Sequence, residues 1–481
     1  MRKKLKGSDV VLFSMVAVIL ILGAVLIMTM PKALLNEDNS VVAGPKPEGN
    51  PLKLPALLED LDPDPLAARY ELTAARGETQ FTGSGSAQTM GYNGTYLGPI
   101  LRMRNGERVE IRVINALDAA TTVHWHGLIV DGEQDGGPHQ VILPGDSWTP
   151  EFVVEQPSAT LWYHPHLQGE TANQVYFGLA GLIYIEDDQA SALPLPKIYG
   201  VDDFPLIVQD RSFNADGGFN YQTTMMGVVP GDQLMVNGTL APYLEVPRGL
   251  VRFRLLNASN AVNFDFTLSD GSDLTQIASD GGLLEAPVVR RNIELAPGER
   301  AEVIVDFSSG KEQSVDLMAN SAPLLEFRVQ NESAAQTTLP STLSYLLPGT
   351  FDNVSDLPVR EFYLESMGIS GTINGKTYDL HRIDEVVSLN TPEVWVVRNT
   401  GGMMMPTGGH PFHIHSTQFR VISRNGETPP PWEQGFKDTV FVRDGEEVRL
   451  LVNFARPGVF MYHCHILEHE DNGMMGQFRV E

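Results

Sequence analysis

The C-terminal stretch Tyr462-His463-Cys464-His465-Ile466-Leu467-Glu468-His469-Glu470-Asp471-Asn472-Gly473-Met474 contains the only cysteine of the chain. The thiol lies between two histidines, and His469 and the thioether of Met474 follow close behind it. A His₂Cys set with a weak axial methionine is typical of blue-copper electron-transfer sites. Alternate side chains of a strand point to opposite faces. We therefore expect Cys464 to bind one copper while its two histidine neighbours face another metal group across the backbone.

The histidines are concentrated in a few places. Ten of the 12 fall in four clusters, and each cluster contains one His-x-His pair: His124/His126, His164/His166, His413/His415 and His463/His465. Residues i and i+2 of a strand share a face, so each pair can point at one place. Eight imidazoles are too many for one tetrahedral metal and indicate a cluster of several copper ions. The remaining His410, Cys464, His469 and Met474 form one blue-copper set.

The thioether argues for copper over zinc, and two histidines lie outside the metal-binding pattern. Zinc is the main rival metal, but zinc sites rarely use thioether ligands. His139 and His381 stand apart from the clusters, and we expect surface or structural roles for them.

An internal repeat explains the spacing of the clusters. Tyr163-His164-Pro165-His166 parallels Tyr462-His463-Cys464-His465, with proline in place of the cysteine. A middle copy is visible in Val251–Asn257, which is similar to Val109–Asn115 and Val394–Asn399. This middle copy contains no histidine, so we interpret it as a structural spacer that lets the outer copies face each other.

The strand pattern predicts the fold class. Apolar residues alternate with period two and are bounded by Gly, Pro, Asn and Asp. Hairpin-like turn signals recur at Pro144-Gly145-Asp146, Pro297-Gly298-Glu299 and Asp444-Gly445-Glu446. We expect an all-β protein with three Greek-key β-sandwich domains. Their predicted bounds are 66–202, 203–332 and 358–481, with a Ser-, Thr-, Leu- and Pro-rich linker at 333–357.

The N-terminal region has the pattern of a membrane anchor. An apolar run at 10–30 is long enough to cross a bilayer, and the basic segment 1–9 before it should stay in the cytoplasm. Residues 31–65 would then be an extracytoplasmic tether. Cleavage of the run as a signal peptide is the alternative, and the protein would then be secreted. The expected location is therefore extracytoplasmic, with the membrane as a partner through this helix.

Composition argues against nucleic-acid binding and against a disulfide-bonded fold. The net charge of −26, from 34 basic and 60 acidic residues, makes nucleic acid an improbable partner. One cysteine excludes an intrachain disulfide framework and leaves the thiol free as a ligand.

The four clusters, in this order, resemble those of the multicopper oxidases over about Leu66 to Glu481. The resemblance is carried by Thr122–Leu128, Asp135–Pro138, His410–His415 and Leu467–Met475. Within that family the chain looks most similar to bacterial copper-efflux cuprous oxidases and laccase-like enzymes. The resemblance implies three cupredoxin-like domains and four copper ions: one type 1, one type 2 and two type 3.

The resemblance also implies ligand roles. His410, Cys464 and His469 would bind the type 1 copper, with Met474 axial, and His124 and His413 the type 2 copper. The type 3 pair would be bound by His126, His164, His166, His415, His463 and His465. Asp135 and Glu470 match acids that the family places near the trinuclear cluster for proton delivery.

The implied activity is one-electron oxidation of a reductant coupled to four-electron reduction of O₂ to water, with electrons leaving the type 1 copper through Cys464. Met403, Met404 and Met405 precede His410, and thioethers suit Cu(I). The long methionine-rich insert of the cuprous oxidases is missing, because Ser333–Thr372 holds only Met367. Cu(I), phenols and aromatic amines are therefore all possible electron donors. We expect the protein to have a role in copper tolerance.

Two alternatives compete with this interpretation. A copper nitrite reductase also pairs a blue copper with a His-bound type 2 copper, but it typically has two such units per chain and lacks the full set of four pairs. A non-enzymatic copper-binding envelope protein would be a relict of the oxidase fold. Such relatives lose ligands, and none is lost here.

Overall fold

The computed structural model describes residues 49–225, 227–308, 314–334, 338–344, 354–401 and 408–481. The all-β prediction is confirmed, since strands make up most of the secondary structure and the helices are short. The basic segment 1–9 and the predicted membrane helix 10–30 lie outside the described residues. In the part of the chain that is described, no helix has the length and apolar character needed to cross a membrane.

The first β-sandwich packs a five-stranded sheet against a four-stranded one. The larger sheet has the order β3 (Gly85–Tyr92), β2 (Ala67–Thr82), β5 (Arg108–Asn115) and β7 (Ser147–Trp148), with β8 (Glu151–Val153) also paired to β5. The smaller has the order β4 (Leu101–Arg104), β10 (Gly181–Glu186), β9 (Ala159–His164) and β6 (His124–His126). Their apolar faces share one core, which includes Leu72, Ile111, Trp125, Leu161 and Ile183.

The middle sandwich pairs a six-stranded with a seven-stranded sheet around a core rich in phenylalanine. The first sheet has the order β1 (Asn50–Pro51), β16 (Pro242–Arg248), β24 (Ala322–Ser333), β23 (Ser314–Ala319), β18 (Phe264–Leu268) and β21 (Ile293–Leu295). The second has the order β15 (Thr239–Leu240), β14 (Gln233–Val236), β11 (Asp203–Arg211), β17 (Leu250–Asn257), β22 (Arg300–Asp306), β19 (Leu274–Ser279) and β20 (Gly282–Arg290). Two short strands, β12 (Thr223–Thr224) and β13 (Gly227–Val228), pair only with each other.

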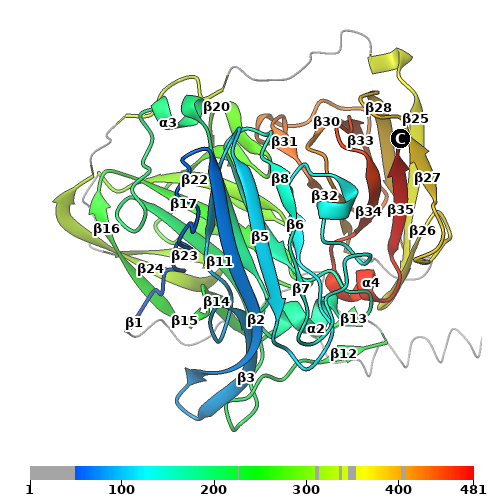
Figure 1. Ribbon diagram of the computed structural model, residues 1–481. Helices are drawn as coiled ribbons and strands as arrows, with labels where there is room; N and C mark the ends of the chain where they lie inside the picture. The colour runs from blue at the N-terminus through cyan, green and yellow to red at the C-terminus, as the bar shows by residue number, and fades with distance from the viewer. Residues whose placement is uncertain (1–48, 226, 309–313, 335–337, 345–353, 402–407) are drawn as a thin grey trace, which may run out of the picture. The chain divides into compact units, whose positions relative to one another are not determined.

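The third sandwich runs from yellow to red in Figure 1. One sheet has the order β26 (Ser370–Ile373), β25 (Val359–Met367), β28 (Glu393–Asn399), β33 (Glu447–Val452), β30 (Phe419–Arg424) and β31 (Phe436–Lys437). The other has the order β27 (Glu385–Val387), β35 (Met475–Val480), β34 (Gly458–Cys464), β29 (His410–Ile414) and β32 (Thr439–Val442). Cys464 and Met474 belong to the core between these sheets, together with Phe362, Trp395 and Phe478.

The internal repeat has a structural basis in three equivalent asparagines. Asn115, Asn257 and Asn399 are buried at the ends of β5, β17 and β28. Their carbonyls accept the backbone N–H of Gly145, Gly298 and Gly445 at 2.8, 2.9 and 3.0 Å respectively. These glycines lie in the predicted hairpin-like turns. The second and third turns are not hairpins, because β21 and β22 lie in different sheets, as do β32 and β33.

The described part of the predicted tether 31–65 is not free chain. β1 pairs in parallel with β16, and the Leu58 N–H donates to the Ile100 carbonyl at 2.8 Å. Leu52 and Leu54 pack on the middle core, so their apolar side chains hold this segment in the fold. The predicted linker is also partly packed, since Leu343 is buried and bonds to the Glu285 carbonyl at 2.8 Å.

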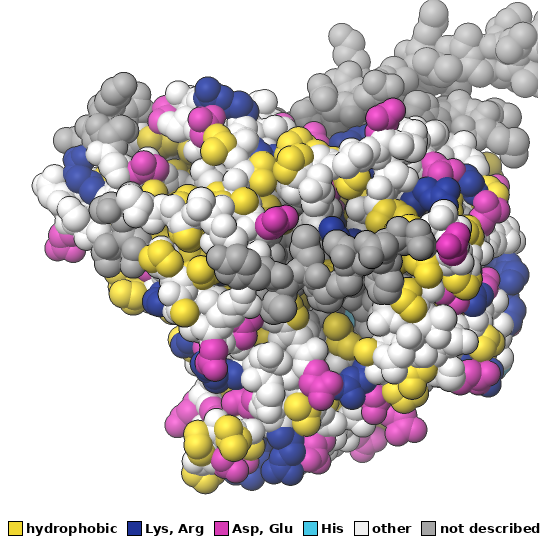
Figure 2. Space-filling view, turned by 90° about the horizontal axis from the view of Figure 1, so that it is seen from above, with side chains coloured by type: hydrophobic (Ala, Val, Ile, Leu, Met, Phe, Trp, Pro, Cys, Tyr) yellow, Lys and Arg dark blue, Asp and Glu magenta, His cyan; other side chains and the backbone are white. Residues whose placement is uncertain are grey.

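The first and middle sandwiches share an apolar interface. Trp162 and Leu182, on β9 and β10, pack against Ile207 and Leu256, on β11 and β17. Hence the small sheet of the first sandwich is buried on both faces. On the outer face shown in Figure 2, Asp and Glu side chains are dispersed among Lys, Arg and separate hydrophobic side chains.

Candidate metal centre

The histidine pairs lie side by side on neighbouring strands. In the first sandwich β6 and β9 are antiparallel, and His124 is paired with His164. In the third, β29 and β34 are antiparallel in the same way, and His413 is paired with His463. Of the remaining partners, His126 ends β6, His415 and His465 directly follow β29 and β34, and His166 lies two residues after the end of β9. All eight imidazoles are buried.

The histidines of the outer sandwiches meet face to face. The His124 and His415 rings stack with centroids 3.8 Å apart, and the His126 and His413 rings stack at 3.7 Å. In addition, His166 Nε2 lies 3.1 Å from the Nε2 atoms of both His415 and His463. The expected convergence of the four pairs is therefore present in the structure.

The eight residues divide into compact groups. One group is His126, His164 and His465, and a second is His166, His415 and His463; within each, the ligand atoms lie within 4.8 Å of one another. The two remaining histidines, His124 and His413, form a third group with His415. Three-residue groups of this size can each hold one metal ion.

Burial keeps these imidazoles neutral. It lowers the pKa of His164 to about 3, and it lowers the pKa values of the other seven well below the ordinary value. Neighbouring imidazoles lower the pKa values of several of them further, because two cations would repel at this distance. Neutral imidazole is the form that binds metal ions.

Several buried ring nitrogens have no hydrogen-bond partner. They are His124 Nε2, His126 Nδ1, His164 Nε2, His166 Nδ1, His413 Nε2 and both nitrogens of His465. An unsatisfied buried polar atom costs about 1–3 kcal/mol. A cluster of such atoms on neutral imidazoles fits copper, for which nitrogen donors are suitable ligands.

A separate group of candidate ligands lies around Cys464. Its Sγ lies 3.3 Å from His410 Nδ1 and 3.7 Å from His469 Nδ1, which belongs to helix α4 (Leu467–Asp471). Met474 is also buried, and its carbonyl accepts the Cys464 N–H at 3.0 Å. Burial raises the pKa of the thiol, so a bound cation is needed to stabilise the thiolate.

Two carboxylates touch the histidine cluster. Asp135 Oδ2 lies 2.8 Å from His415 Nδ1, and burial raises the pKa of Asp135 to about 6. Glu470 lies 3.2 Å from His463 Nδ1 and 3.4 Å from His166 Nδ1, and burial raises its pKa as well. Both acids predicted from the sequence therefore contact the imidazoles.

Sequence reasoning missed a third acid. Asp438 is fully buried, and its Oδ1 lies 2.9 Å from His126 Nε2. Its backbone carbonyl lies 2.8 Å from His413 Nδ1. Asp438 stands outside every histidine motif, so no local pattern in the sequence marks it.

The two isolated histidines and the three consecutive methionines lie away from the histidine cluster or outside the described residues. His139 bonds to Gln477 at 2.8 Å across the two outer sandwiches, which fits a structural role, and His381 is exposed. The possible substrate residues Met403, Met404 and Met405 lie outside the described residues.

Comparison with known proteins agrees with this geometry. Three multicopper oxidase family models match residues 73–190, 187–345 and 352–481. The chain is 43% identical over 415 residues to the multicopper oxidase mco of Staphylococcus haemolyticus, covering 85% of this chain and 88% of the relative. It is 39% identical over 450 residues to the cell division protein FtsP of Salmonella typhimurium, covering 89% and 92%. The laccase of Pediococcus acidilactici superposes with a TM-score of 0.87 at 38% identity, covering 92% of this chain and 96% of that one.

The chain belongs to the multicopper oxidase family. It has the cupredoxin-like fold of that family, and copper is its implied cofactor. It is an oxidase that takes electrons from a reducing substrate and passes them to O₂.

Proposed function

We propose that the chain holds four copper ions in two separate sites. His410, Cys464, His469 and Met474 would hold the type 1 copper. His124 and His413 would hold the type 2 copper. The groups His126/His164/His465 and His166/His415/His463 would each hold one type 3 copper. The observation that supports this most is the division of the six type 3 candidates into two groups of three within 4.8 Å.

Bound copper would supply one-electron redox chemistry and a place for O₂ to be reduced. The chain contributes the connection between the two sites, because Cys464 is covalently bonded to His463 and His465. Asp135 and Glu470 would hold protons at oxygens that face His415 and His463, where O₂ reduction consumes them. Strand pairing fixes His124 against His164 and His413 against His463, so little rearrangement should accompany each electron.

The reducing substrate would approach beside His410. Ser366 is partly buried, and its hydroxyl lies 3.2 Å from His410 Nε2; its neighbour Met367 is 86% exposed. This edge of the imidazole is therefore close to the surface. The proposed electron donors are Cu(I) and phenols or aromatic amines. The protein would act in copper tolerance at an extracytoplasmic location.

Oxygen uptake by the copper-loaded chain tests the proposal. We expect four copper ions per chain and O₂ consumption with Cu(I), with a phenol or with both. Nitrite should not replace O₂ as acceptor; nitrite consumption without O₂ uptake would favour the nitrite reductase alternative.

A non-enzymatic copper-binding envelope protein is the second alternative that the sequence leaves. Copper binding without any O₂ uptake, with every donor class, would support it. The complete ligand set of this chain supports the oxidase instead.

A further inference from the structure

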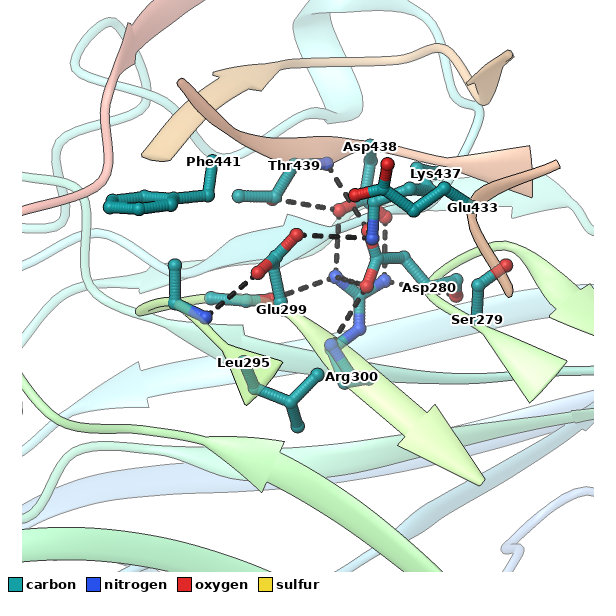
Figure 3. A network of polar contacts seen from close by, with 12 residues as sticks. Ser279, Asp280, Leu295, Glu299, Arg300, Glu433, Lys437, Asp438, Thr439 and Phe441 are labelled. Atoms are coloured by element: carbon teal, nitrogen blue, oxygen red, sulfur yellow. Dashed lines mark hydrogen bonds and ion pairs between the residues drawn. The ribbon is translucent and has the colours of Figure 1, made fainter. Parts of the chain in front are cut away.

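The middle sandwich has no histidine, yet it reaches the trinuclear ligands through one side chain. Arg300 begins strand β22 and is 1% exposed. Its guanidinium donates to both carboxylate oxygens of Asp438, at 2.7 and 2.5 Å (Figure 3). Asp438 in turn contacts His126, so one residue separates Arg300 from a proposed copper ligand.

Arg300 joins all three sandwiches. Besides Asp438 of the third sandwich, it donates to the carbonyl of Thr160 in the first at 3.1 Å. It also donates to the carbonyls of Gly298 and Asp280 in the middle sandwich, at 2.9 and 3.1 Å. The planar fork of arginine can satisfy several fixed acceptors at once, which a lysine cannot do.

The pair with Arg300 fixes the orientation of the Asp438 carboxylate. Two parallel N–H···O bonds specify geometry more tightly than a single one. The carboxylate is held further by Gln418 Nε2 at 2.9 Å and by the Thr439 hydroxyl at 3.0 Å. Thus Asp438 Oδ1 lies 2.9 Å from His126 and 3.7 Å from His413 as part of a rigid network.

The network also places charge near the histidines. Lys437 pairs with Asp280 at 2.9 Å and with Glu299 at 3.1 Å, next to Arg300 (Figure 3). Asp280, Glu299 and Asp438 give three negative charges against two positive charges from Arg300 and Lys437.

The turn before Arg300 touches the cluster directly. Gly298 has φ +85°, and a Cβ at this position would lie 2.9 Å from the His465 ring. The middle sandwich therefore reaches the proposed ligands at two places, His126 through Asp438 and His465 directly. These contacts go beyond the role of a structural spacer that the sequence suggests.

We propose that Arg300 is a positioning residue of the trinuclear copper site. It holds the Asp438 carboxylate against His126 and His413, and so maintains the affinity of these ligands for copper. This proposal rests on the copper assignment above. Mutation of residues that orient metal ligands by hydrogen bonds typically lowers metal affinity about 10- to 100-fold.

Arg300→Lys and Arg300→Met test the proposal, with Arg254→Met as the matched control. Arg254 is also a buried arginine of the middle sandwich; it pairs with Asp203 at 2.7 Å and donates to the Thr160 hydroxyl at 2.8 Å. No contact joins it to Asp438 within the described residues. Each copper-loaded variant is dialysed against a chelator, and copper content, the blue absorption band and the type 2 EPR signal are measured.

We expect both Arg300 variants to lose copper from the trinuclear site at chelator concentrations about 10- to 100-fold lower than the wild type does. Their type 2 EPR parameters should change, while the blue band stays. Arg254→Met should lose thermal stability but keep both copper signals. Arg300→Lys is expected to be the milder variant, since it keeps the buried positive charge.

Three results would overturn the proposal. The first is an unchanged EPR signal and copper retention in a folded Arg300 variant. The second is equal copper loss in Arg254→Met. The third is failure of both Arg300 variants to fold while Arg254→Met folds, which would assign Arg300 to stability alone. A wild-type chain without type 2 and type 3 copper signals would instead contradict the copper assignment itself.

Discussion

The imidazoles of His126 and His413 stack with centroids 3.7 Å apart and an interplanar angle of 13°, although they belong to the first and third sandwiches. Burial and neighbouring imidazoles lower the pKa of both rings, and neutral rings can pack this closely. The fold itself therefore brings histidines of opposite sandwiches close together.

Cys464→Ser should abolish the blue absorption and the turnover of the enzyme. The variant removes the only thiolate, but it leaves the eight clustered imidazoles in place. The type 2 EPR signal should therefore remain. Oxidase activity equal to the wild type would refute the proposed electron route through Cys464.

His164→Ala should have the opposite effect. It removes one member of a three-histidine group, while Cys464, His410 and His469 are untouched. Visible absorption spectra and an oxygen electrode check the result: we expect a retained blue band with no O₂ reduction. Loss of the blue band together with turnover would argue against two separate sites.

Gly371→Ala should perturb the type 1 site through the proposed ligand Met474. An added Cβ would lie 2.5 Å from Met474 Sδ, so the thioether must move. We expect a shifted blue band and a changed reduction potential, with unchanged type 2 EPR. Gly83→Ala is the control, because a Cβ there meets no atom within 4 Å. Identical spectra for both variants and the wild type would show that Met474 is not a copper ligand.

Asp135→Asn should slow O₂ reduction without altering the type 1 copper. The carboxylate lies 2.8 Å from His415 Nδ1, and an amide cannot hold and release a proton there. Loss of a general acid or base typically costs about 10²–10⁴-fold in rate. Steady-state kinetics should show a lower kcat and an unchanged KM for the reductant. A kcat within twofold of the wild type would exclude Asp135 from proton delivery.

Glu302 should make the copper-free protein sensitive to acid. Burial alone would raise its pKa, but Arg252 and Arg254 outweigh that effect and lower it from 4.5 to about 2. A lowered folded-state pKa stabilises the protein above the unfolded-state pKa, and this stability is lost as the pH falls from about 4.5 towards 2. The difference corresponds to about 3 kcal/mol.

Glu302→Gln is the test of that contribution. The variant should be less stable at neutral pH, because it removes the buried carboxylate that Arg252 and Arg254 share and leaves only Asp203 to pair with them. Its unfolding free energy in urea should also fall less steeply between pH 5 and about 3 than that of the wild type. Equal slopes for the two proteins would contradict the prediction.

Much of the site could be predicted from local patterns. His124, His126, His463 and His465 alternate with other residues, and strand geometry alone directs each pair to one face. The soft donors around Cys464 identify the second metal group in the same way. The hairpin prediction was wrong at Gly298 and Gly445, because sequence does not show which of two facing sheets the next strand joins.

The sequence by itself determined which side chains carry nitrogen and sulfur donors and how they are paired along the chain, since donor chemistry and the period of a strand are local properties. Only the tertiary structure decided which histidine pairs lie together, and which acidic and basic side chains hold them in place. Asp438 and Arg300 lie far apart in the chain and in no motif, and they contact each other at 2.7 Å through the packing of two sandwiches. A single aspartate or arginine has the same local appearance wherever it occurs, so its partner is defined only by the fold.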